Sequence, residues 1–477
     1  MKKILFVTSE AHPLLKTGGL ADVSGSLPKA LAELSQDVRL IIPKYHALKT
    51  FNDVRFLCSL RVDNRQVDLL ETQMPDSEVK VLLLDYPDFY GRPGNPYVDA
   101  DGDSWPDNAE RFALFCRIAV EVGMDRAGLD WQPDIIHCND WQSGLVPALL
   151  SLEENPPPSV FTIHNMAYQG LFPAESIRGI NLPGQLWHPD GVEFHQMLSF
   201  IKGGLVYADH ITTVSPTYAL EIQTPAFGYG LEGLLQHRKD DLTGIINGID
   251  IDLWNPQDDP LIPQPYQAKT LAKKQSNKSE LQQHFALPVD ADVPLFGLIG
   301  RLVDQKGIDL IIDCLPEMMT MPLQFVLLGA GEKDYERRLQ NIADLFADKM
   351  AVTVGYNEPL AHLIEAGADV FLMPSRFEPC GLNQMYSQRY GTLPIVRKTG
   401  GLADTVVDAL PHTIADNTAT GFVFNDASAS SLLEAIKRTL MAYSDKKAWA
   451  KIQANAMKAD FSWQYSAEQY LKLYRSL

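Results

Sequence analysis

A loop near the amino terminus combines a cation with two adjacent glycines. Lys16-Thr17-Gly18-Gly19-Leu20 follows an apolar run at residues 4–7 and precedes a helix-like stretch. Because glycines have no side chains, backbone N–H groups at such a helix start could approach an anion, and Lys16 adds a positive charge. The loop matches neither G-x-x-x-x-G-K-[ST] nor G-x-G-x-x-G, which argues against kinase-like and dehydrogenase-like loops. We expect a cradle for the phosphates of a nucleotide-linked substrate.

Two further cations lie in residues 300–307, again where a predicted strand ends before a helix. Arg301 offers a fork for two phosphate oxygens and Lys306 a movable point charge. Together they could neutralise the charge of a leaving diphosphate without a metal. The alternative is a solvated pair of basic residues.

Several other polar residues end predicted strands. Glu378 follows the run 370–373, in a loop where ligands bind in parallel sheets, although a lone Glu there is more often a cap or an ion-pair partner. In the first half, His137, Asp140 and His164 occupy equivalent positions. Each of these three could instead be a hydrogen-bonded core residue, so the pattern gives candidates rather than roles.

The chain contains one internal repeat. Residues 16–22 and 398–404 share the same seven amino acids, Lys-Thr-Gly-Gly-Leu-Ala-Asp, and each copy lies between a strand-like and a helix-like run. Both halves are therefore predicted to use the same strand-to-helix turn. In the second copy the glycines could serve only a tight turn, and its contact with ligand stays open.

Short apolar runs alternate with longer amphipathic stretches throughout the first half. The runs 4–7, 38–42 and 134–137 are apolar without polar alternation, which is typical of strands buried on both faces of a parallel sheet. A proline-rich segment, 254–270, interrupts this pattern. It then restarts with predicted strands at 295–299, 325–328, 352–354, 370–373, 393–396 and 422–424.

These patterns predict two doubly wound α/β halves, with ligands at the carboxyl ends of the strands. A length of 477 residues also favours two domains. The final helical stretch, 463–477, is rich in Tyr and Leu and should dock on one of them, but its periodicity does not say which.

Composition narrows the class of protein. A net charge of −19 opposes long contacts with nucleic acid, and no tract is long and apolar enough to span a bilayer. Five scattered cysteines without a C-x-x-C pair suggest neither a disulfide framework nor a zinc site, and the apolar run at the start is shorter than a signal peptide's core. We expect a cytoplasmic protein without nucleic-acid or membrane partners.

Taken together, the motifs resemble those of the bacterial glycogen synthase and plant starch synthase family. The likeness extends over nearly the whole chain, from the Lys16 loop through Tyr168-Gln169-Gly170, 214–218 and Asn247-Gly248 to Phe461-Ser462-Trp463. The family consists of retaining glucosyltransferases that move glucose from ADP-glucose to the nonreducing end of an α-1,4-glucan. The resemblance therefore implies ADP-glucose and glycogen, or another such glucan, as substrates.

The resemblance implies the GT-B fold, with two Rossmann-like doubly wound domains facing an interdomain cleft that domain closure would assemble into a site. Residues 1–245 would form the acceptor-side domain, completed by a last helix at 460–477 that crosses back to it. Residues 246–459 would form the nucleotide-sugar-binding domain.

The resemblance also implies roles for individual residues. Lys16, Gly18 and Gly19 would face the donor diphosphate from one domain, and Arg301 and Lys306 from the other. Glu378 would contact the donor glucose. The implied catalytic set is Glu378, His164, Lys306, Arg301 and Asp140; the further donor contacts are Asn247, Tyr356 stacked on adenine, Cys380, Gly381 and Leu382; and the contacts to sugar or acceptor are Tyr97 and Asn165.

No pair of carboxylates resembles the nucleophile and acid/base of retaining hydrolases. We therefore expect the leaving diphosphate to accept the proton of the acceptor hydroxyl, which attacks on the same face, with neither metal nor cofactor. In the broader superfamily a Glu that holds the ribose often stands eight residues after the position of Glu378. In this chain the position is Tyr386. The glycogen and starch synthases also lack the Glu, so the resemblance leaves the ribose contacts unassigned.

Three other interpretations are compatible with parts of the sequence. Residues 99–103, Asp-Ala-Asp-Gly-Asp, could bind a metal, either as the D-x-D motif of another glycosyltransferase fold or as a calcium loop that ends at Glu110. Ser104 stands where a calcium loop needs glycine, and a D-x-D enzyme has one nucleotide domain rather than two, so a solvated loop is favoured. An epimerase of the same fold would need no glucan acceptor. A noncatalytic glucan-binding protein would have little need to keep Lys16 and Glu378. These motifs do not predict the preference for ADP-glucose over UDP-glucose. They also do not predict the oligomeric state or the regulation.

Overall fold

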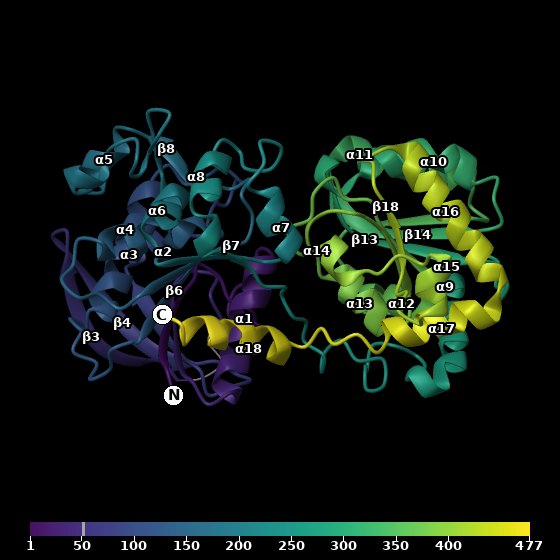
Figure 1. Ribbon diagram of the computed structural model, residues 1–477, viewed down its shortest axis with the longest axis horizontal. Helices are drawn as coiled ribbons and strands as arrows, with labels where there is room; N and C mark the ends of the chain where they lie inside the picture. Colours follow the sequence, from purple (N-terminus) through teal and green to yellow (C-terminus); the bar gives the residue numbers. More distant parts are fainter. Residues whose placement is uncertain (50–52) are drawn as a thin grey trace. The chain divides into compact units, whose positions relative to one another are not determined.

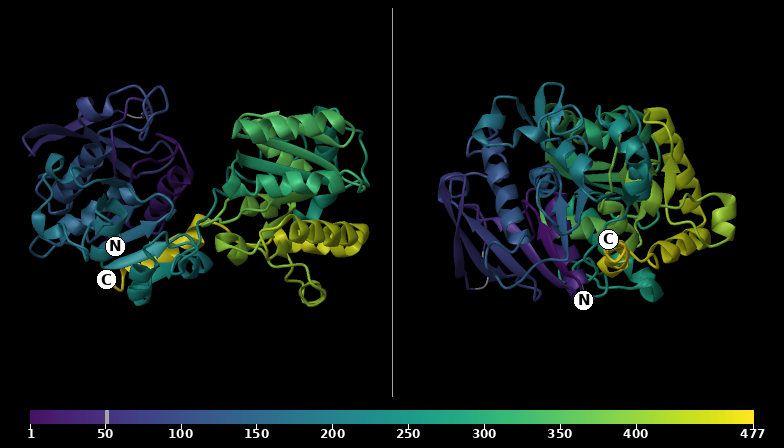
Figure 2. Two further views of the ribbon diagram at one scale, coloured as in Figure 1. Left: turned by 90° about the horizontal axis from the view of Figure 1, so that it is seen from above. Right: turned by 60° about the vertical axis from the view of Figure 1, so that its left-hand side comes forward.

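The computed structural model describes residues 1–49 and 53–477, which form two compact units (Figure 1). Unit 1 comprises Met1–Gly248 and Trp463–Leu477, and unit 2 comprises Ile249–Ser462. The divisions lie a few residues beyond the expected positions, 245 and 459. Both ends of the chain belong to unit 1 (Figure 2).

The main sheet of unit 1 joins nine strands of the described residues, and its parallel part contains the predicted strands. In spatial order they are β12 (Leu242–Gly244), β11 (His210–Thr213), β7 (Ser159–Ile163), β6 (Ile135–Asn139), β1 (Lys3–Val7), β2 (Asp37–Pro43), β5 (Lys80–Asp85), β4 (Arg65–Gln73) and β3 (Arg55–Val62). Neighbours from β12 to β5 are parallel. The predictions at 4–7, 38–42 and 134–137 are confirmed as β1, β2 and β6, because these strands are largely buried on both faces.

Sequence analysis missed the antiparallel pair β3 and β4 at the sheet edge. Their connection is the dipeptide Asp63-Asn64, with φ values of 49° and 60°. Positive φ at both central residues is the requirement of a two-residue hairpin turn that matches strand twist. This dipeptide between two strand-like runs was the signal that could have revealed the hairpin.

Unit 2 contains a six-stranded parallel sheet. Its order is β15 (Met350–Val354), β14 (Gln324–Gly331), β13 (Leu295–Leu302), β16 (Val370–Met373), β17 (Leu393–Arg397) and β18 (Phe422–Phe424). All six strands predicted for the second half are confirmed.

Helices cover both faces of the unit 2 sheet (Figure 1). Phe296 and Leu298 of β13 belong to a core with α10 (Ile308–Met318) and α16 (Ala429–Ser444). The intervening side of the same strand faces another core, where Leu295 joins α9 (Lys274–His284) and α12 (Glu358–Gly367). Burial on both faces explains why the strand is apolar over residues 295–299.

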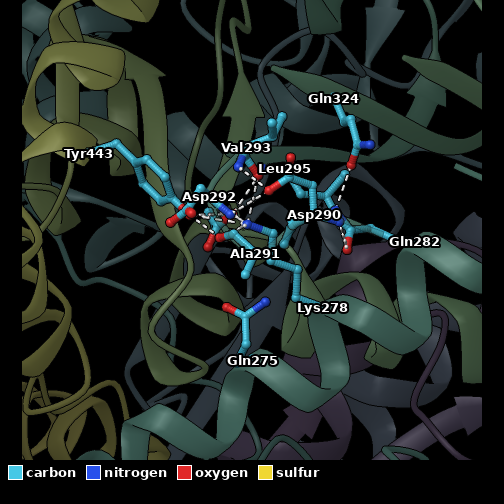
Figure 3. A network of polar contacts seen from close by, with 12 residues as sticks. Gln275, Lys278, Gln282, Asp290, Ala291, Asp292, Val293, Leu295, Gln324 and Tyr443 are labelled. Carbon is cyan, nitrogen blue, oxygen red and sulfur yellow. Dashed lines mark hydrogen bonds and ion pairs between the residues drawn. The ribbon is translucent and has the colours of Figure 1, made fainter. Parts of the chain in front are cut away.

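A buried lysine fixes the chain where it enters β13 (Figure 3). Lys278 Nζ donates to the carbonyl oxygens of Ala291 at 3.0 Å and Val293 at 2.7 Å, and to the Tyr443 hydroxyl at 3.1 Å. It also pairs with Asp369 at 2.8 Å, with only 1% of its side chain exposed. Since a buried charge requires such partners, this network holds the start of β13 in register.

The order of strands reverses at one place in each unit. β1 lies between β2 and β6, and β13 lies between β14 and β16. In doubly wound sheets the loops at the carboxyl ends of such strands diverge to opposite faces and leave room for ligands. The predicted site residues after β1, β6, β13 and β16 stand at these two positions.

The last helix, α18 (Trp463–Tyr474), belongs to unit 1 and packs against α1 (Gly19–Glu33) (Figure 1). Ser466 Oγ donates to the Ile246 carbonyl at 2.6 Å, and the Tyr474 hydroxyl lies 2.6 Å from His137 Nδ1. None of the helices in the described part of the chain has the length and apolar character to cross a membrane.

Candidate active site

The Lys16 loop joins β1 to α1, as predicted, but its backbone is already bonded to an anion. The Glu10 carboxylate accepts the Thr17 N–H at 2.6 Å and the Gly18 N–H at 3.1 Å. Lys16 Nζ pairs with Asp22 at 2.7 Å and stays half-exposed. Sequence analysis missed Glu10, because an acid was not expected in a phosphate cradle.

The two glycines of this loop have open space around them. A Cβ built on Gly18 or Gly19 would meet no atom within 4 Å. The pair is therefore not required by packing within unit 1. Open space beside an exposed lysine and the start of a long helix is consistent with the approach of a ligand phosphate.

Asp140, after β6, has an unusual backbone conformation for a residue with a side chain. Its φ is 57° and its ψ is −179°, a region that glycine alone adopts readily. Its side chain is buried, and Oδ1 has no hydrogen-bond partner among the described residues. Strained backbone and an unpaired buried oxygen together favour a ligand-binding role over a satisfied core residue.

Burial raises the pKa of Asp140 to about 7. Backbone N–H groups of His164 and Asn165 oppose this rise, and the nearby charge of Glu10 adds to it. His164 follows β7, and its Nε2 lies 3.1 Å from the Asn139 amide oxygen. Burial lowers the pKa of His164 to about 3, so its imidazole is neutral at neutral pH. The structure thus brings Asp140, His164 and Asn165 together.

We expect Asp140→Asn to change how stability depends on pH. The folded-state pKa exceeds the ordinary value of about 4, so the wild type loses stability as pH rises from about 4 to about 7, where the buried group must ionise. Asparagine cannot ionise, so the variant should gain stability relative to wild type across this window, by about 1.4 kcal/mol for each pH unit. Urea unfolding at pH 4.5 and 7.5 measures this; a difference that is constant with pH would contradict it.

His137 does not join this group. Its ring is fully buried between the Thr162 hydroxyl, 2.6 Å from Nε2, and the Tyr474 hydroxyl, 2.6 Å from Nδ1. Burial lowers the pKa of His137 to about 3. It is the hydrogen-bonded core residue of the alternative interpretation, and it anchors α18.

Two other predicted contacts of unit 1 differ in their surroundings. Asn247 is buried, and its amide oxygen has no partner among the described residues, which fits a ligand contact. The Tyr97 hydroxyl donates to Glu10 at 2.8 Å and lies 2.8 Å from Ser9 Oγ. Burial and the Glu10 charge hold the pKa of Tyr97 well above its usual value, so the phenol stays protonated.

In unit 2 the structure brings Lys306 and Glu378 into contact. Lys306 Nζ donates to Glu378 Oε2 at 2.5 Å, and Ser375 Oγ donates to the same oxygen at 3.1 Å. Glu378 is buried, whereas a quarter of the Lys306 side chain is exposed. The pair therefore places an accessible cation on a fixed carboxylate at the junction of β13 and β16.

A glycine brings these two loops together. Gly307 ends the 3-10 turn η5 (Asp304–Lys306) with a φ of 67°, and a Cβ there would lie 2.2 Å from the Pro374 carbonyl oxygen. Gln305 bridges the loops as well, because its carbonyl accepts the Arg376 N–H at 2.8 Å. Close backbone approach thus requires the glycine that follows Lys306.

Arg301 lies near the end of β13 with an exposed side chain. Among residues 1–49 and 53–477 it forms no ion pair, so its charge is available to a ligand. The neighbouring Arg376, in contrast, is engaged by Asp304 and Asp309. Of the two arginines, Arg301 suits an incoming anion and Arg376 holds the loop.

The second copy of the repeat supports the Glu378 loop. Gly401 N–H donates to the carbonyl oxygens of Glu378 and Pro379, both at 3.1 Å. A Cβ on Gly400 would lie 2.0 Å from the Glu378 carbonyl oxygen, and one on Gly401 would lie 2.1 Å from that of Cys380. In this copy the glycines allow close packing against the Glu378 loop.

The remaining predicted donor contacts lie in unit 2. Cys380 is buried, Gly381 has a φ of 73°, and Leu382 precedes the short helix α13 (Asn383–Arg389). Tyr356 follows β15 and is 86% exposed.

The acidic segment 99–103 is organised by its own backbone. Asp99 Oδ1 accepts the N–H groups of Asp101 and Asp103, both at 3.0 Å. Within the described ranges, no group of three or more His, Cys, Asp or Glu residues has the arrangement of a metal site.

Comparisons with known proteins agree with this geometry. Residues 3–237 match the family model "Starch synthase catalytic domain", and residues 279–457 match "Glycosyl transferases group 1". The chain is 55% identical to glycogen synthase 1 of Methylococcus capsulatus, over 99% of this chain and 96% of that one. It is 51% identical to glycogen synthase of Cellvibrio japonicus over the whole of both chains.

The chain belongs to the glycogen synthase and starch synthase family. Among solved structures it is similar to the catalytic domain of starch synthase IV from Arabidopsis thaliana bound to ADP and acarbose. The TM-score is 0.87 and the identity 34%, over 100% of this chain and 99% of that one. The family resemblance, the GT-B fold and the glycosyltransferase class predicted from the motifs are confirmed.

Tyr386 belongs to an aromatic stack in unit 2. Its ring stacks on Trp254, with centroids 4.0 Å apart and planes 15° apart, and the other face of Trp254 stacks on His362. The position that holds a ribose-binding Glu in the broader superfamily is thus part of an aromatic stack in this glycogen synthase family member.

Proposed function

We propose that this protein is a retaining glucosyltransferase that transfers glucose from ADP-glucose to the nonreducing end of an α-1,4-glucan and releases ADP. The observation that carries the proposal is the Lys306–Glu378 pair between the loops after β13 and β16. The full-length similarity to glycogen synthases supports the reaction, and the ADP and acarbose bound to the Arabidopsis protein support the two substrate classes.

In unit 2, we assign Arg301 and Lys306 to the donor diphosphate. Both are cations at the end of β13 with accessible side chains. Glu378 orients Lys306 and contacts the donor glucose, the Cys380-Gly381-Leu382 turn contacts sugar and phosphates, and Tyr356 stacks on adenine. Charge on the departing ADP would then be neutralised by groups that are already oriented, which is an effective form of transition-state stabilisation.

In unit 1, we assign Lys16, Gly18 and Gly19 to the donor diphosphate. His164 and Asn247 border the transferred glucose with Asp140 beside it, and Tyr97 and Asn165 contact sugar or acceptor. The unpaired buried oxygens of Asp140 and Asn247 would gain hydrogen bonds from sugar hydroxyl groups.

The proposed chemistry retains anomeric configuration without a covalent enzyme intermediate. The C1–O bond to the diphosphate breaks while the acceptor hydroxyl attacks C1 from the same face, and its proton passes to the departing diphosphate oxygen. The positive charges and the positioning of both substrates supply the rate enhancement. The proposal requires no metal and no cofactor, and the five cysteines, which form no disulfide among the described residues, fit a cytoplasmic location.

The function is tested by incorporation of radiolabelled glucose into glycogen from ADP-glucose and from UDP-glucose, each with and without a chelator. We expect incorporation from ADP-glucose that survives chelation. Loss of activity with chelator would overturn the metal-free mechanism. Conversion of the donor to an epimer without a glucan would favour an isomerase, and glycogen binding without ADP release would favour a binding protein.

Lys16→Ala should weaken donor use while leaving the fold intact. The Lys16 side chain is half-exposed, and among the described residues its one ion pair is with Asp22, so it contributes little to the core. Loss of one phosphate contact should raise the KM for ADP-glucose roughly tenfold, which corresponds to about 1.4 kcal/mol. Steady-state kinetics and a thermal melt test this together; a variant that unfolds would show that the lysine is structural.

A further inference from the structure

Glu10 is an acid in the loop after β1 to which the proposed function gives no role. It is 3% exposed, although it adjoins the exposed Lys16 loop. Its carboxylate accepts hydrogen bonds from four groups: the Thr17 N–H at 2.6 Å, the Thr17 hydroxyl at 2.8 Å, the Gly18 N–H at 3.1 Å and the Tyr97 hydroxyl at 2.8 Å.

These hydrogen bonds occupy part of the predicted phosphate-binding loop and leave the rest for a ligand. Thr17 and Gly18 direct their N–H groups at one oxygen, Glu10 Oε2, as successive N–H groups do around a bound anion. They are therefore occupied by an internal carboxylate. In the first turn of α1, which begins at Gly19, the Ala21 N–H donates to the Gly18 carbonyl at 3.2 Å. The N–H groups of Gly19 and Leu20 lie at the helix start, where intrahelical acceptors are lacking, and they remain for a ligand together with Lys16.

The same carboxylate links two predicted contacts that are far apart in the sequence. Glu10 Oε1 accepts from Tyr97, which the proposed function assigns to sugar or acceptor, while Oε2 accepts from the loop assigned to donor phosphate. Ser9 Oγ, 2.8 Å from the Tyr97 hydroxyl, completes the set. A carboxylate suits this position because it has acceptor sites only and four donors converge on it.

We propose that Glu10 is a positioning residue that fixes the Lys16 loop and the Tyr97 phenol as one unit, so that donor binding depends on it without direct contact. This inference rests on the proposed role of the loop in donor binding. Glutamine at this position would preserve shape but present an NH2 group to donors, which forces some of them apart. Loop and phenol would both shift, and the oriented cation of Lys16 would be lost to the substrate.

The first test is Glu10→Gln with the KM for ADP-glucose, the KM for glycogen and kcat measured separately. We expect the KM for ADP-glucose to rise at least tenfold. Thr17→Val, which removes one donor and keeps the side-chain shape, should raise it severalfold, and the double variant should be no worse than Glu10→Gln alone. Additive effects of the two changes would overturn the proposal, and Thr17→Val still tests it if Glu10→Gln fails to fold.

Asp209→Asn is a matched control. The Asp209 carboxylate accepts the Ser159 N–H at 2.7 Å and the Ser159 hydroxyl at 3.1 Å, but at the amino end of β7. It should lower the melting temperature without changing the KM for ADP-glucose, which separates loss of stability from loss of positioning.

Lys16→Ala distinguishes the positioning role of Glu10 from the donor-binding role of the Lys16 loop. If Lys16→Ala raises the KM for ADP-glucose and Glu10→Gln does not, the positioning role of Glu10 is wrong and the proposed function stands. If neither variant changes this KM, the donor role of the whole loop is wrong, and the inference about Glu10 falls with it.

Discussion

Replacing Glu378 with glutamine is expected to lower kcat by roughly a hundredfold, with a smaller change in the KM for ADP-glucose. Glu378 holds Lys306 through a 2.5 Å contact and is itself held by Ser375. A neutral amide would weaken that contact and leave the Lys306 cation free to adopt other rotamers. Stabilisation of the departing diphosphate would suffer most, because it depends on a cation oriented before the reaction.

Steady-state kinetics with ADP-glucose and glycogen test this expectation, with Glu434→Gln as control. Glu434 also pairs with a lysine in unit 2, Lys437 at 3.3 Å, but on the exposed surface of α16. That variant should keep wild-type kinetics. An unchanged kcat in Glu378→Gln would refute a role for the carboxylate in turnover, and an equal loss in both variants would point to a general effect of charge.

Gly401→Ala is expected to have the second large effect, on stability and activity together. Its Cβ would lie 2.1 Å from the Cys380 carbonyl oxygen, a backbone atom that cannot move without displacing the Glu378 loop. Overpacking of this kind costs on the order of 1–3 kcal/mol. Because the displaced loop carries Glu378, we also expect kcat to fall at least tenfold in the molecules that remain folded.

Thermal melts and kinetics below the melting temperature separate the two effects. Gly233→Ala is the matched control, because a Cβ there meets no atom within 4 Å and the residue lies in helix α8 (Glu232–His237). It should be as stable as wild type or slightly more so, since alanine favours helix over glycine. If Gly401→Ala kept both its melting temperature and its kcat, the second repeat would not support the Glu378 loop.

The two copies of the repeat lie in different environments. Both copies lie at strand-to-helix turns, as their residues predict. In the first copy, Gly18 and Gly19 border open space, whereas Gly400 and Gly401 meet the backbone of the Glu378 loop. Local sequence determines the shape of the turn. The residues that contact the glycines of the second copy, Glu378 and Cys380, are more than twenty positions away in the sequence.

The sequence by itself was sufficient for the strands of both parallel cores, the two-unit organisation, the family and a list of candidate site residues. Strands such as β1 and β13 are apolar on both faces, and this pattern can be read without knowing their neighbours. Strand ends then place residues such as Asp140 and Glu378 where ligands bind in such sheets.

Tertiary structure alone decided which candidates have partners. His137 and His164 end adjacent strands and look equivalent in sequence, yet His137 is closed off by Tyr474 from the end of the chain. Glu10 accepts a hydrogen bond from Tyr97, and Glu378 accepts one from Lys306; neither contact can be predicted from the local sequence. Hydrogen bonds and burial depend on atoms brought together by folding over tens to hundreds of residues, so no local pattern contains them. The Lys16 loop was predicted from its residues; the carboxylate that holds it became visible only in the folded chain.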